Sequence, residues 1–559
     1  MARTPLMLEL QGLAQDHRLA GRWGIPLSAV RERRADITRR QFLKGGAAGA
    51  AGLALAGPWS IAQSAFAASP RVGIIGAGVS GLTAALTLQD AGIRATVYEA
   101  STRVGGRMHS DSPVTNPNNS STWANAQTSE WCGELIDQGH KTILHLAQRF
   151  GLATVNLLAG EPNGSDDTYY FFGRYYPKDQ ADSDFQPVHN ALQGDVQAAS
   201  YPTTYRINTP GGIALDNMSA YEWIERKVPG GHRSAMGQLL DVAYNIEYGA
   251  ETTDQSALNL VYLLGYSAKP GNFAIFGASN EKYHIVGGNQ RLPETIAVNL
   301  NEPVATGWRM TAIGFNRDGS IAVTFSVGGQ TTVRNFDRVI LALPFAVLRT
   351  LSYRKANFDS MKRTAIQELG SGRNDKLQLQ FTSRYWNQSG PWVSQVGISN
   401  GASYADTGYQ NTWDVTRSQS GTTGILVDYT GGNVAGSFTP STPYSSATDN
   451  PQVTAYAMTF LKQLEPIYAG ITAFWNGRAT LSVPALDPNL NCSYSYWRVG
   501  QYHTFSGYEK ARQPFPNGPI HFAGEHCSQD FQGFMEGGAS EGVRAANEIL
   551  GDYKAGIFP

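Results

Sequence analysis

The order of apolar and polar residues after residue 70 predicts a strand, a turn, a helix and a second strand. An apolar run of strand length, Val72–Ile75, leads into a glycine-rich turn at residues 76–81. A segment with helical periodicity then extends to about Gly92, and Ala95–Tyr98 has the composition of a second strand. This order is typical of the first βαβ unit of a parallel α/β sheet.

The glycines of this turn have the spacing GxGxxG, and each has a physical role. Gly76 allows a tight turn, Gly78 lets the backbone approach a pyrophosphate, and Gly81 permits close packing of the helix on the strand. Glu99 follows the second strand, where a carboxylate can accept both hydroxyl groups of a ribose. The sequence therefore predicts a Rossmann-like dinucleotide-binding domain.

Later patterns predict a second region of mixed structure. Helical segments are expected at 140–150, 236–246 and 257–264. Residues 376–382 alternate between polar and apolar types and predict a strand with one face exposed to water. The long, polar and aromatic stretch at 160–215 indicates a surface excursion or a lid. A mixed α+β domain is the simplest architecture for these segments.

The N-terminal leader, residues 1–67, has the pattern of an export signal. The paired arginines of residues 38–44 precede an uncharged run rich in glycine and alanine, which ends at Ala65-Phe66-Ala67. These are the parts of a bacterial twin-arginine signal, which predicts a protein that is periplasmic or secreted. The apolar run of the leader is too short and too rich in glycine to span a bilayer, and no later segment offers the roughly 18 uncharged apolar residues that stable membrane insertion needs.

Charge and cysteine content argue against several classes of protein. The 559 residues exceed one compact core, and they include 44 basic and 45 acidic residues, which argues against nucleic-acid binding. Residues 1–44 hold nine basic and four acidic residues, so the remaining chain carries a net charge of −6. Cys132, Cys492 and Cys527 are odd in number and widely spaced, which predicts neither a disulfide scaffold nor a bound metal.

A second glycine pair follows the expected ribose contact. In Arg103-Val104-Gly105-Gly106-Arg107 the glycines bring the backbone close to a ligand, and the arginines provide positive charge for a diphosphate. This extension resembles the FAD signature of the flavin amine oxidase family, which includes monoamine, polyamine and L-amino-acid oxidases. The resemblance extends from residue 71 to about 550, and it is closest to bacterial L-amino-acid oxidases exported through the twin-arginine pathway.

Further segments have the same resemblance, at residues 287–293, 336–344, 522–525 and 532–539. The resemblance implies FAD as the cofactor, with a backbone contact to adenine at Val304. The full set of implied FAD contacts is Gly76, Gly78, Ser80, Gly81, Glu99, Ala100, Arg103, Gly106, Arg107, Val304, Gly524, Glu525, Gly533, Phe534 and Met535.

The resemblance also implies two interleaved domains after the leader. The FAD-binding domain is expected at residues 70–130, 285–375 and 480–550. The substrate-binding domain, which includes a helical part, is expected at residues 131–284 and 376–479.

The resemblance assigns chemistry to a few residues near the flavin. Lys376 resembles the strand-borne lysine that holds a water molecule beside the flavin and assists its reaction with oxygen or the hydrolysis of the imine. Phe534 takes the place of an aromatic ring that packs the substrate. Ser493 occupies the place of the usual second aromatic ring, so Trp497 or Tyr496 would have to replace it.

The resemblance also bears on the attachment of FAD and on the binding of a substrate carboxylate. Cys492 aligns with the covalent attachment site of monoamine oxidases, but L-amino-acid oxidases generally bind FAD without a bond, and non-covalent FAD is expected here. Animal L-amino-acid oxidases bind the carboxylate with an arginine that residues 130–137 lack. Arg417 and Arg498 are alternative candidates, and Glu134 is expected to contact FAD or a cationic substrate.

The leading hypothesis is an L-amino-acid oxidase that yields 2-oxo acids, ammonia and hydrogen peroxide. A monoamine or polyamine oxidase is the first alternative, because the arginine is missing. An amino-acid 2-monooxygenase that releases an amide and carbon dioxide is the second, and an FAD-binding redox sensor is a non-enzymatic one. The expected partners are an amino acid as the small-molecule substrate, oxygen and, in a homodimer, a second copy of the chain.

Overall fold

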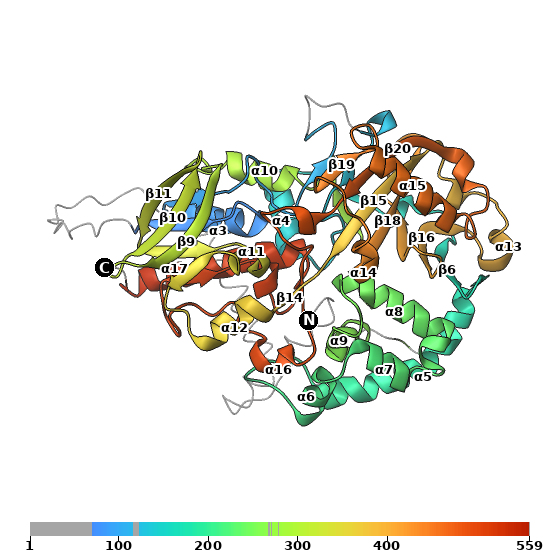
Figure 1. The fold of residues 1–559 in the computed structure, drawn as a ribbon, viewed down its shortest axis with the longest axis horizontal. Coiled ribbons are helices and arrows are strands. Elements are labelled where there is room, and N and C mark those ends of the chain that lie inside the picture. The colour runs from blue at the N-terminus through green and yellow to red at the C-terminus, as the bar shows by residue number, and fades with distance from the viewer. Residues whose placement is uncertain (1–69, 116–121, 266–268, 270, 278, 558–559) are drawn as a thin grey trace, which may run out of the picture.

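The structure, a computed structural model, describes residues 70–115, 122–265, 269, 271–277 and 279–557. The predicted leader at 1–67 lies outside the described residues. Two sheet-containing lobes lie along the longest axis of the molecule, and a group of helices lies beside the second lobe (Figure 1).

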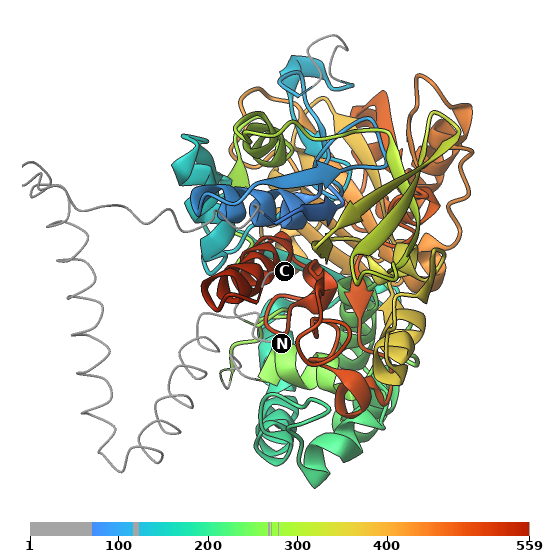
Figure 2. The same cartoon turned by 90° about the vertical axis from the view of Figure 1, so that its left-hand side faces the viewer.

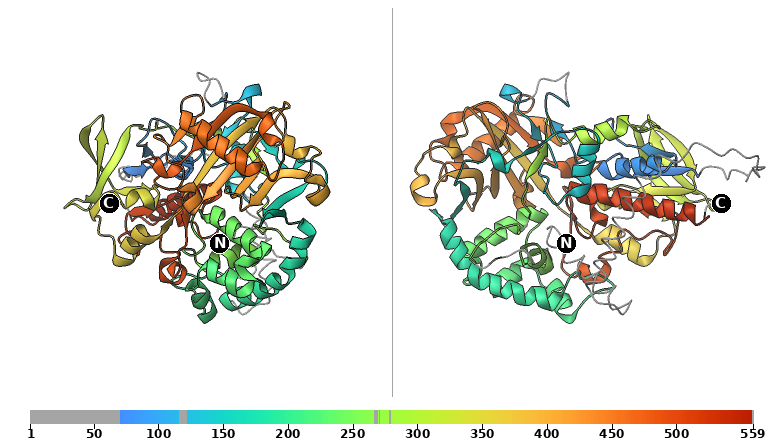
Figure 3. Two further views of the ribbon diagram at one scale, coloured as in Figure 1. Left: turned by 45° about the vertical axis from the view of Figure 1, so that its right-hand side comes forward. Right: turned by 180° about the vertical axis from the view of Figure 1, so that it is seen from behind.

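The first lobe is built on a four-stranded parallel sheet with the order β2-β1-β12-β22. Its central strands are buried on both faces, which requires the continuous apolar runs seen in the sequence. The strands are β1 Val72–Ile75, β2 Ala95–Tyr98, β12 Arg338–Leu341 and β22 Ile520–Phe522. Helices α3 (Val79–Asp90) and α17 (Met535–Lys554) pack side by side in this lobe (Figure 3). The first and last helices of the described chain thus meet.

A second sheet, of order β11-β10-β9-β13, flanks the parallel sheet (Figure 2). Its strands are β9 Trp308–Phe315, β10 Ile321–Val327, β11 Gln330–Phe336 and β13 Ser352–Lys355. Three separate two-stranded sheets pair β3 Ser110–Asp111 with β4 Ser129–Glu130, β5 Thr154–Asn156 with β8 Tyr283–Ile285, and β14 Gly370–Ser371 with β21 Ser495–Tyr496. The shorter helices are α4 Lys141–Arg149, α10 Arg291–Val298, α11 Phe345–Leu348, α12 Ser360–Glu368 and α16 Gln501–Phe505.

The second lobe contains an eight-stranded mixed sheet with the order β19-β20-β15-β18-β17-β16-β6-β7. Its strands are β6 Asp166–Phe171, β7 Arg174–Tyr175, β15 Asn374–Phe381, β16 Ser399–Ala405, β17 Asn411–Asp414, β18 Gly424–Gly431, β19 Tyr444–Ser446 and β20 Trp475–Ser482. Helices α13 Val393–Val396, α14 Gly432–Ala435 and α15 Pro451–Leu464 accompany the sheet. The apolar residues of β15 and α15 share one buried cluster.

The helical group is formed by α5 Lys178–Ala199, α6 Pro210–Asp216, α7 Ala220–Lys227, α8 Ala235–Tyr248 and α9 Ala257–Gly265. Helix α9 is buried along its whole length, and α8 contacts the eight-stranded sheet at β18. The fold therefore has the predicted Rossmann-like α/β part together with a mixed α+β part.

Two local predictions were wrong. Every residue of β15 is buried, although its alternating pattern predicted a face exposed to water. The polar residues of that face pack on the segment around residue 130, where the amides of Gln378 and Gln380 donate to the carbonyl oxygens of Glu130 and Ala124. The stretch 160–215 is regular structure rather than a loose excursion, because it contains β6, β7, α5 and α6.

Gly81 provides a test of the close packing at the glycine turn. A Cβ atom at this position would lie 1.9 Å from the carbonyl oxygen of Gly76, which is a backbone atom that cannot move without opening the turn. We expect Gly81→Ala to destabilise the protein by about 1–3 kcal/mol and to lower its content of bound FAD, measured by thermal unfolding and by visible flavin absorbance.

Gly194→Ala is the matched control, because Gly194 lies in helix α5 with open space around its Cα. This control should be neutral or stabilising by up to about 1 kcal/mol. Equal flavin content and stability in the two variants would contradict the proposed packing.

Candidate active site

A cavity of about 570 Å³ extends from the glycine turn of the first lobe to the eight-stranded sheet of the second. Most residues implied as FAD contacts line it, namely Gly76, Gly78, Ser80, Glu99, Ala100, Arg103, Gly106, Arg107, Gly524, Glu525, Gly533, Phe534 and Met535. Gly81 and Val304 are not among the lining residues, since Gly81 packs behind the turn and Val304 lies beside the end of β2. The cavity therefore brings together side chains from both ends of the described chain.

The glycine turns form the first end of the cavity. Gly78 pairs with Gly105 in a short parallel bridge, and the space beyond the Cα of Gly78 is open. The hydroxyl of Ser80, at the N-terminus of α3, has no hydrogen-bond partner among the described residues. Glu99 accepts hydrogen bonds from the backbone N–H groups of Ala77 and Ser101, both at 2.8 Å. A helix N-terminus beside open glycine backbone is suited to a pyrophosphate.

Arg107 and Glu525 form an ion pair further along the cavity, with Nη1 and Oε1 2.9 Å apart; Glu525 is buried and Arg107 is partly buried. Glu525 also accepts from the hydroxyl of Ser495 at 2.8 Å and from the backbone N–H of Gly533 at 2.8 Å. Burial alone would raise the pKa of Glu525, but the charge of Arg107 holds this pKa below its usual value. The sequence suggested that Arg107 neutralises a diphosphate, whereas its charge is already balanced by Glu525.

Lys376 and Glu134 form a second buried ion pair, on the wall that faces the substrate side of the cavity. The Lys376 ammonium donates to Oε2 of Glu134 at 2.7 Å, and the indole N–H of Trp413 donates to Oε1 at 2.9 Å. Burial would raise the pKa of Glu134, but Lys376 outweighs this effect and lowers it. Nothing in the sequence pattern linked these three residues, which come from the segment after β4, from β15 and from β17.

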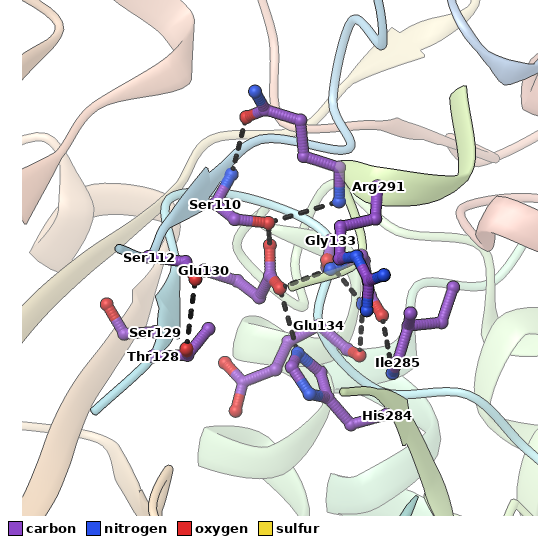
Figure 4. Close-up of polar contacts among 12 residues, drawn as sticks. Ser110, Ser112, Thr128, Ser129, Glu130, Gly133, Glu134, His284, Ile285 and Arg291 are labelled. Atoms are coloured by element: carbon purple, nitrogen blue, oxygen red, sulfur yellow. Dashed lines mark hydrogen bonds and ion pairs between the residues drawn. The ribbon is translucent and has the colours of Figure 1, made fainter. Parts of the chain in front are cut away.

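A buried polar network holds the backbone of Glu134 in place (Figure 4). The amide of Asn289 donates to the carbonyl oxygen of Glu134 at 2.7 Å, while Glu130 accepts from the backbone N–H of Asn289 at 2.8 Å. Glu130 is fully buried and also binds the hydroxyl of Ser110 at 2.7 Å and Nε2 of His284 at 2.8 Å. The loop that carries Glu134 is thus fixed from several elements.

Arg417 lies in the cavity wall with most of its surface buried. Its Nη1 pairs with Oε1 of Glu161 at 2.7 Å, and its Nε donates to the carbonyl oxygen of Asp414 at 3.1 Å. Asp167 and Glu281 line the cavity as well. Burial and the nearby Asp137 raise the pKa of Glu281 to about 7. This part of the cavity holds more carboxylates than cations.

Comparison with known proteins assigns the chain to a family. Residues 79–550 match the model of the flavin-containing amine oxidoreductases. The chain belongs to this family. Residues 36–56 match the twin-arginine translocation signal sequence, so the protein is exported. Both matches confirm the resemblance found in the sequence.

The relatives of this amine oxidoreductase are named as oxidases of different kinds of amine. The protein named "Putative L-amino-acid oxidase YobN" from Bacillus subtilis (strain 168) is 25% identical, with 85% of this chain and 94% of the relative covered. Polyamine oxidase 2 from Arabidopsis thaliana is also 25% identical, over 86% of this chain and 88% of the relative. The solved structure of cyclohexylamine oxidase from Brevibacterium oxydans IH-35A has a TM-score of 0.69 at 21% identity, covering 87% of this chain and all of that one.

These comparisons establish a flavin-dependent amine oxidoreductase with FAD as its cofactor. The open glycine backbone, the free hydroxyl of Ser80 and the N-termini of α3 and α17 at the cavity fit an FAD molecule. Within the described part of the chain, no helix is long and apolar enough to cross a membrane, and no group of side chains is suited to hold a metal ion.

Several residues of this oxidoreductase lie elsewhere than the sequence suggested. Trp497 is buried among Tyr502 and Phe505 and does not line the cavity, so it has no contact with a substrate there. Arg498 pairs with Asp254 and is half exposed outside the cavity. Tyr494, which the sequence did not single out, lines the cavity beside Ser493 and shares a hydrogen bond with the hydroxyl of Tyr429.

Cys492 lies in a small pocket beside the main cavity rather than in its wall. Burial raises the pKa of its thiol to about 11, so the nucleophilic thiolate is scarce at neutral pH.

We therefore expect acid precipitation of the oxidoreductase to release all of its flavin as FAD and to leave a colourless pellet. Cys492→Ser should retain the same flavin content. Flavin that stays with the wild-type pellet but not with the Cys492→Ser pellet would contradict non-covalent binding.

Proposed function

We propose that this exported amine oxidoreductase is an L-amino-acid oxidase, which converts an L-amino acid, water and oxygen to a 2-oxo acid, ammonia and hydrogen peroxide. The observation that carries the proposal is the buried guanidinium of Arg417 in the cavity wall. Among the described residues its Nη2 has no hydrogen-bond partner, so that nitrogen is available to a substrate carboxylate.

The cavity walls around Lys376 suit the oxidation of an amine. FAD, when bound, is the two-electron oxidant. Trp413 and Tyr429 contact each other with ring centroids 5.1 Å apart, and with Phe534 they give the cavity an aromatic surface that excludes water and packs the substrate. We propose that Lys376 holds a water molecule near the flavin, in the orientation that Glu134 imposes on its ammonium group.

A simple amine or polyamine oxidase is the second candidate. Its support is the Glu134–Lys376 pair, because Glu134 neutralises the cation nearest to the aromatic wall. A substrate without a carboxylate needs no free cation in the cavity wall, so a neutralised Lys376 suits it. The monooxygenase reaction differs only in its products, and the mass of the product distinguishes an amide from a 2-oxo acid. A redox sensor without turnover would give neither product.

We also propose a domain division, a mode of FAD binding and an oligomeric state. The FAD-binding domain is placed at residues 70–130, 285–375 and 480–550, and the substrate-binding domain at residues 131–284 and 376–479. FAD is proposed to be bound without a covalent bond. The protein is proposed to be a homodimer, which light scattering of the purified protein measures directly.

Replacing Arg417 tests the proposed carboxylate contact. We expect Arg417→Gln, made together with Glu161→Gln so that no lone carboxylate is buried, to raise KM for L-amino acids roughly 10- to 100-fold, because one charge-assisted hydrogen bond is lost. Turnover of an amine without a carboxylate should be unchanged, if the enzyme accepts one. Peroxide and ammonia release are the measurements.

Arg498→Gln is the matched control, since Arg498 is also paired with a carboxylate but lies outside the cavity. This variant should keep the wild-type KM. An equal rise in KM for both arginine variants would overturn the role of Arg417. Peroxide formed only from amines without a carboxylate would overturn the L-amino-acid oxidase and favour the second candidate.

A further inference from the structure

Asp167 and Glu281 are two carboxyl groups on the substrate side of the cavity, and neither forms an ion pair with a cation among the described residues. Lys376 is paired with Glu134, and Arg417 is paired with Glu161. Within the described residues, neither Asp167 nor Glu281 takes part in an ion pair. On this side of the cavity Lys376 and Arg417 each have a carboxylate partner while two further carboxyl groups have none, so this side attracts a positively charged group.

The two carboxylates lie close enough to influence each other and the same tyrosine. Each one raises the pKa of Tyr404, which is almost fully buried and also lines the cavity. Asp167 accepts hydrogen bonds from the amide of Asn400 at 3.0 Å and from the hydroxyl of Tyr169 at 3.5 Å, and both partners are neutral. The carboxylate of Glu281 has no hydrogen-bond partner among the described residues. A ligand that provides ammonium or guanidinium N–H groups would satisfy both.

The backbone of Glu281 is held in position by a separate carboxylate. Oδ1 of the buried Asp137 accepts from the backbone N–H groups of Asn280 and Glu281, at 3.1 and 2.7 Å, and from the hydroxyl of Ser279 at 3.0 Å. Glu281 has a φ of 45°, which is unusual for a residue with a side chain. The turn therefore holds Glu281 in one place in the cavity wall.

We propose that Asp167 and Glu281 form a subsite for a second cationic group of the substrate. This inference rests on the proposed function, and it identifies the substrates as L-amino acids whose side chain ends in an ammonium or guanidinium group. Arg417 lines the same cavity and its charge acts on Glu281, so this cavity can hold both charges of such a molecule. Diamines share the same cationic chemistry and are distinguished by the experiment below.

The experiment compares L-lysine with L-norleucine, which lacks the terminal amine, and with cadaverine, which lacks the carboxylate. Wild-type kcat/KM, measured on the holoenzyme by peroxide release, should be at least tenfold higher for L-lysine than for L-norleucine. Glu281→Gln and Asp167→Asn should each raise KM for L-lysine roughly 10- to 100-fold, because a charged hydrogen bond becomes a neutral one. Both variants should leave the values for L-norleucine nearly unchanged.

Asp166→Asn is the matched control, because Asp166 is the exposed neighbour of Asp167 on β6 and does not line the cavity. It should keep the wild-type preference. Equal losses for L-lysine and L-norleucine in Glu281→Gln and Asp167→Asn, or a wild-type preference for L-norleucine, would overturn the subsite. Oxidation of cadaverine alone, weakened by Glu281→Gln, would support the subsite and overturn the L-amino-acid oxidase, so the two failures are distinguishable.

Discussion

The buried ion pair between Lys376 and Glu134 is the interaction on which the candidate active site depends. It joins the segment after β4 to the third strand of the eight-stranded sheet, and both residues are more than nine-tenths buried. Removing one partner of such a pair leaves an unmatched charge in the interior, which costs about 3–5 kcal/mol. The network of Glu130, Asn289 and His284 holds the Glu134 loop, so the pair is supported from several elements.

The same principle repeats along the cavity. Three cations of the cavity walls each form an ion pair with a carboxylate from a distant segment: Arg107 with Glu525, Lys376 with Glu134, and Arg417 with Glu161. Long-range pairing therefore determines how much charge is left for a ligand. On the substrate side the carboxyl groups of Asp167 and Glu281 are left without an ion pair, while one nitrogen of Arg417 is left to bind an anion. The proposed preference for substrates with a cationic side chain follows from this balance of paired and unpaired charges in the cavity, and not from any one charged residue.

Local features of the fold were predictable from the sequence, because they depend on residues close together in the chain. The glycine turn at 76–81, the flanking strands and the helices around α8 and α9 all follow from spacing and periodicity. Helix α5 was missed, although Ala181, Phe185, Val188 and Leu192 recur at helical spacing and are all buried. Its many polar residues and an internal proline hid that pattern.

The pairing of charges could not be predicted, because it depends on which distant segments meet. Lys376 was identified by resemblance, but its partner Glu134 lies 242 residues away along the chain. The alternation of β15 suggested a face in water, yet the polar face of that strand meets another protein segment through Gln378 and Gln380. Trp497 was chosen as an aromatic near the flavin motif, while tertiary packing placed Tyr494 in the cavity instead.

The affinity of the holoenzyme for benzoate, a carboxylate without an amine, tests whether Glu134 neutralises Lys376. It is followed by the change in the visible flavin spectrum in mildly acidic buffer. If Glu134 neutralises Lys376, Glu134→Gln should bind benzoate about tenfold more tightly than the wild type, the effect of one charge-assisted hydrogen bond. Adding Lys376→Met to that variant should abolish the gain. Equal benzoate affinity in the wild type and in Glu134→Gln would contradict the neutralisation of Lys376 by Glu134.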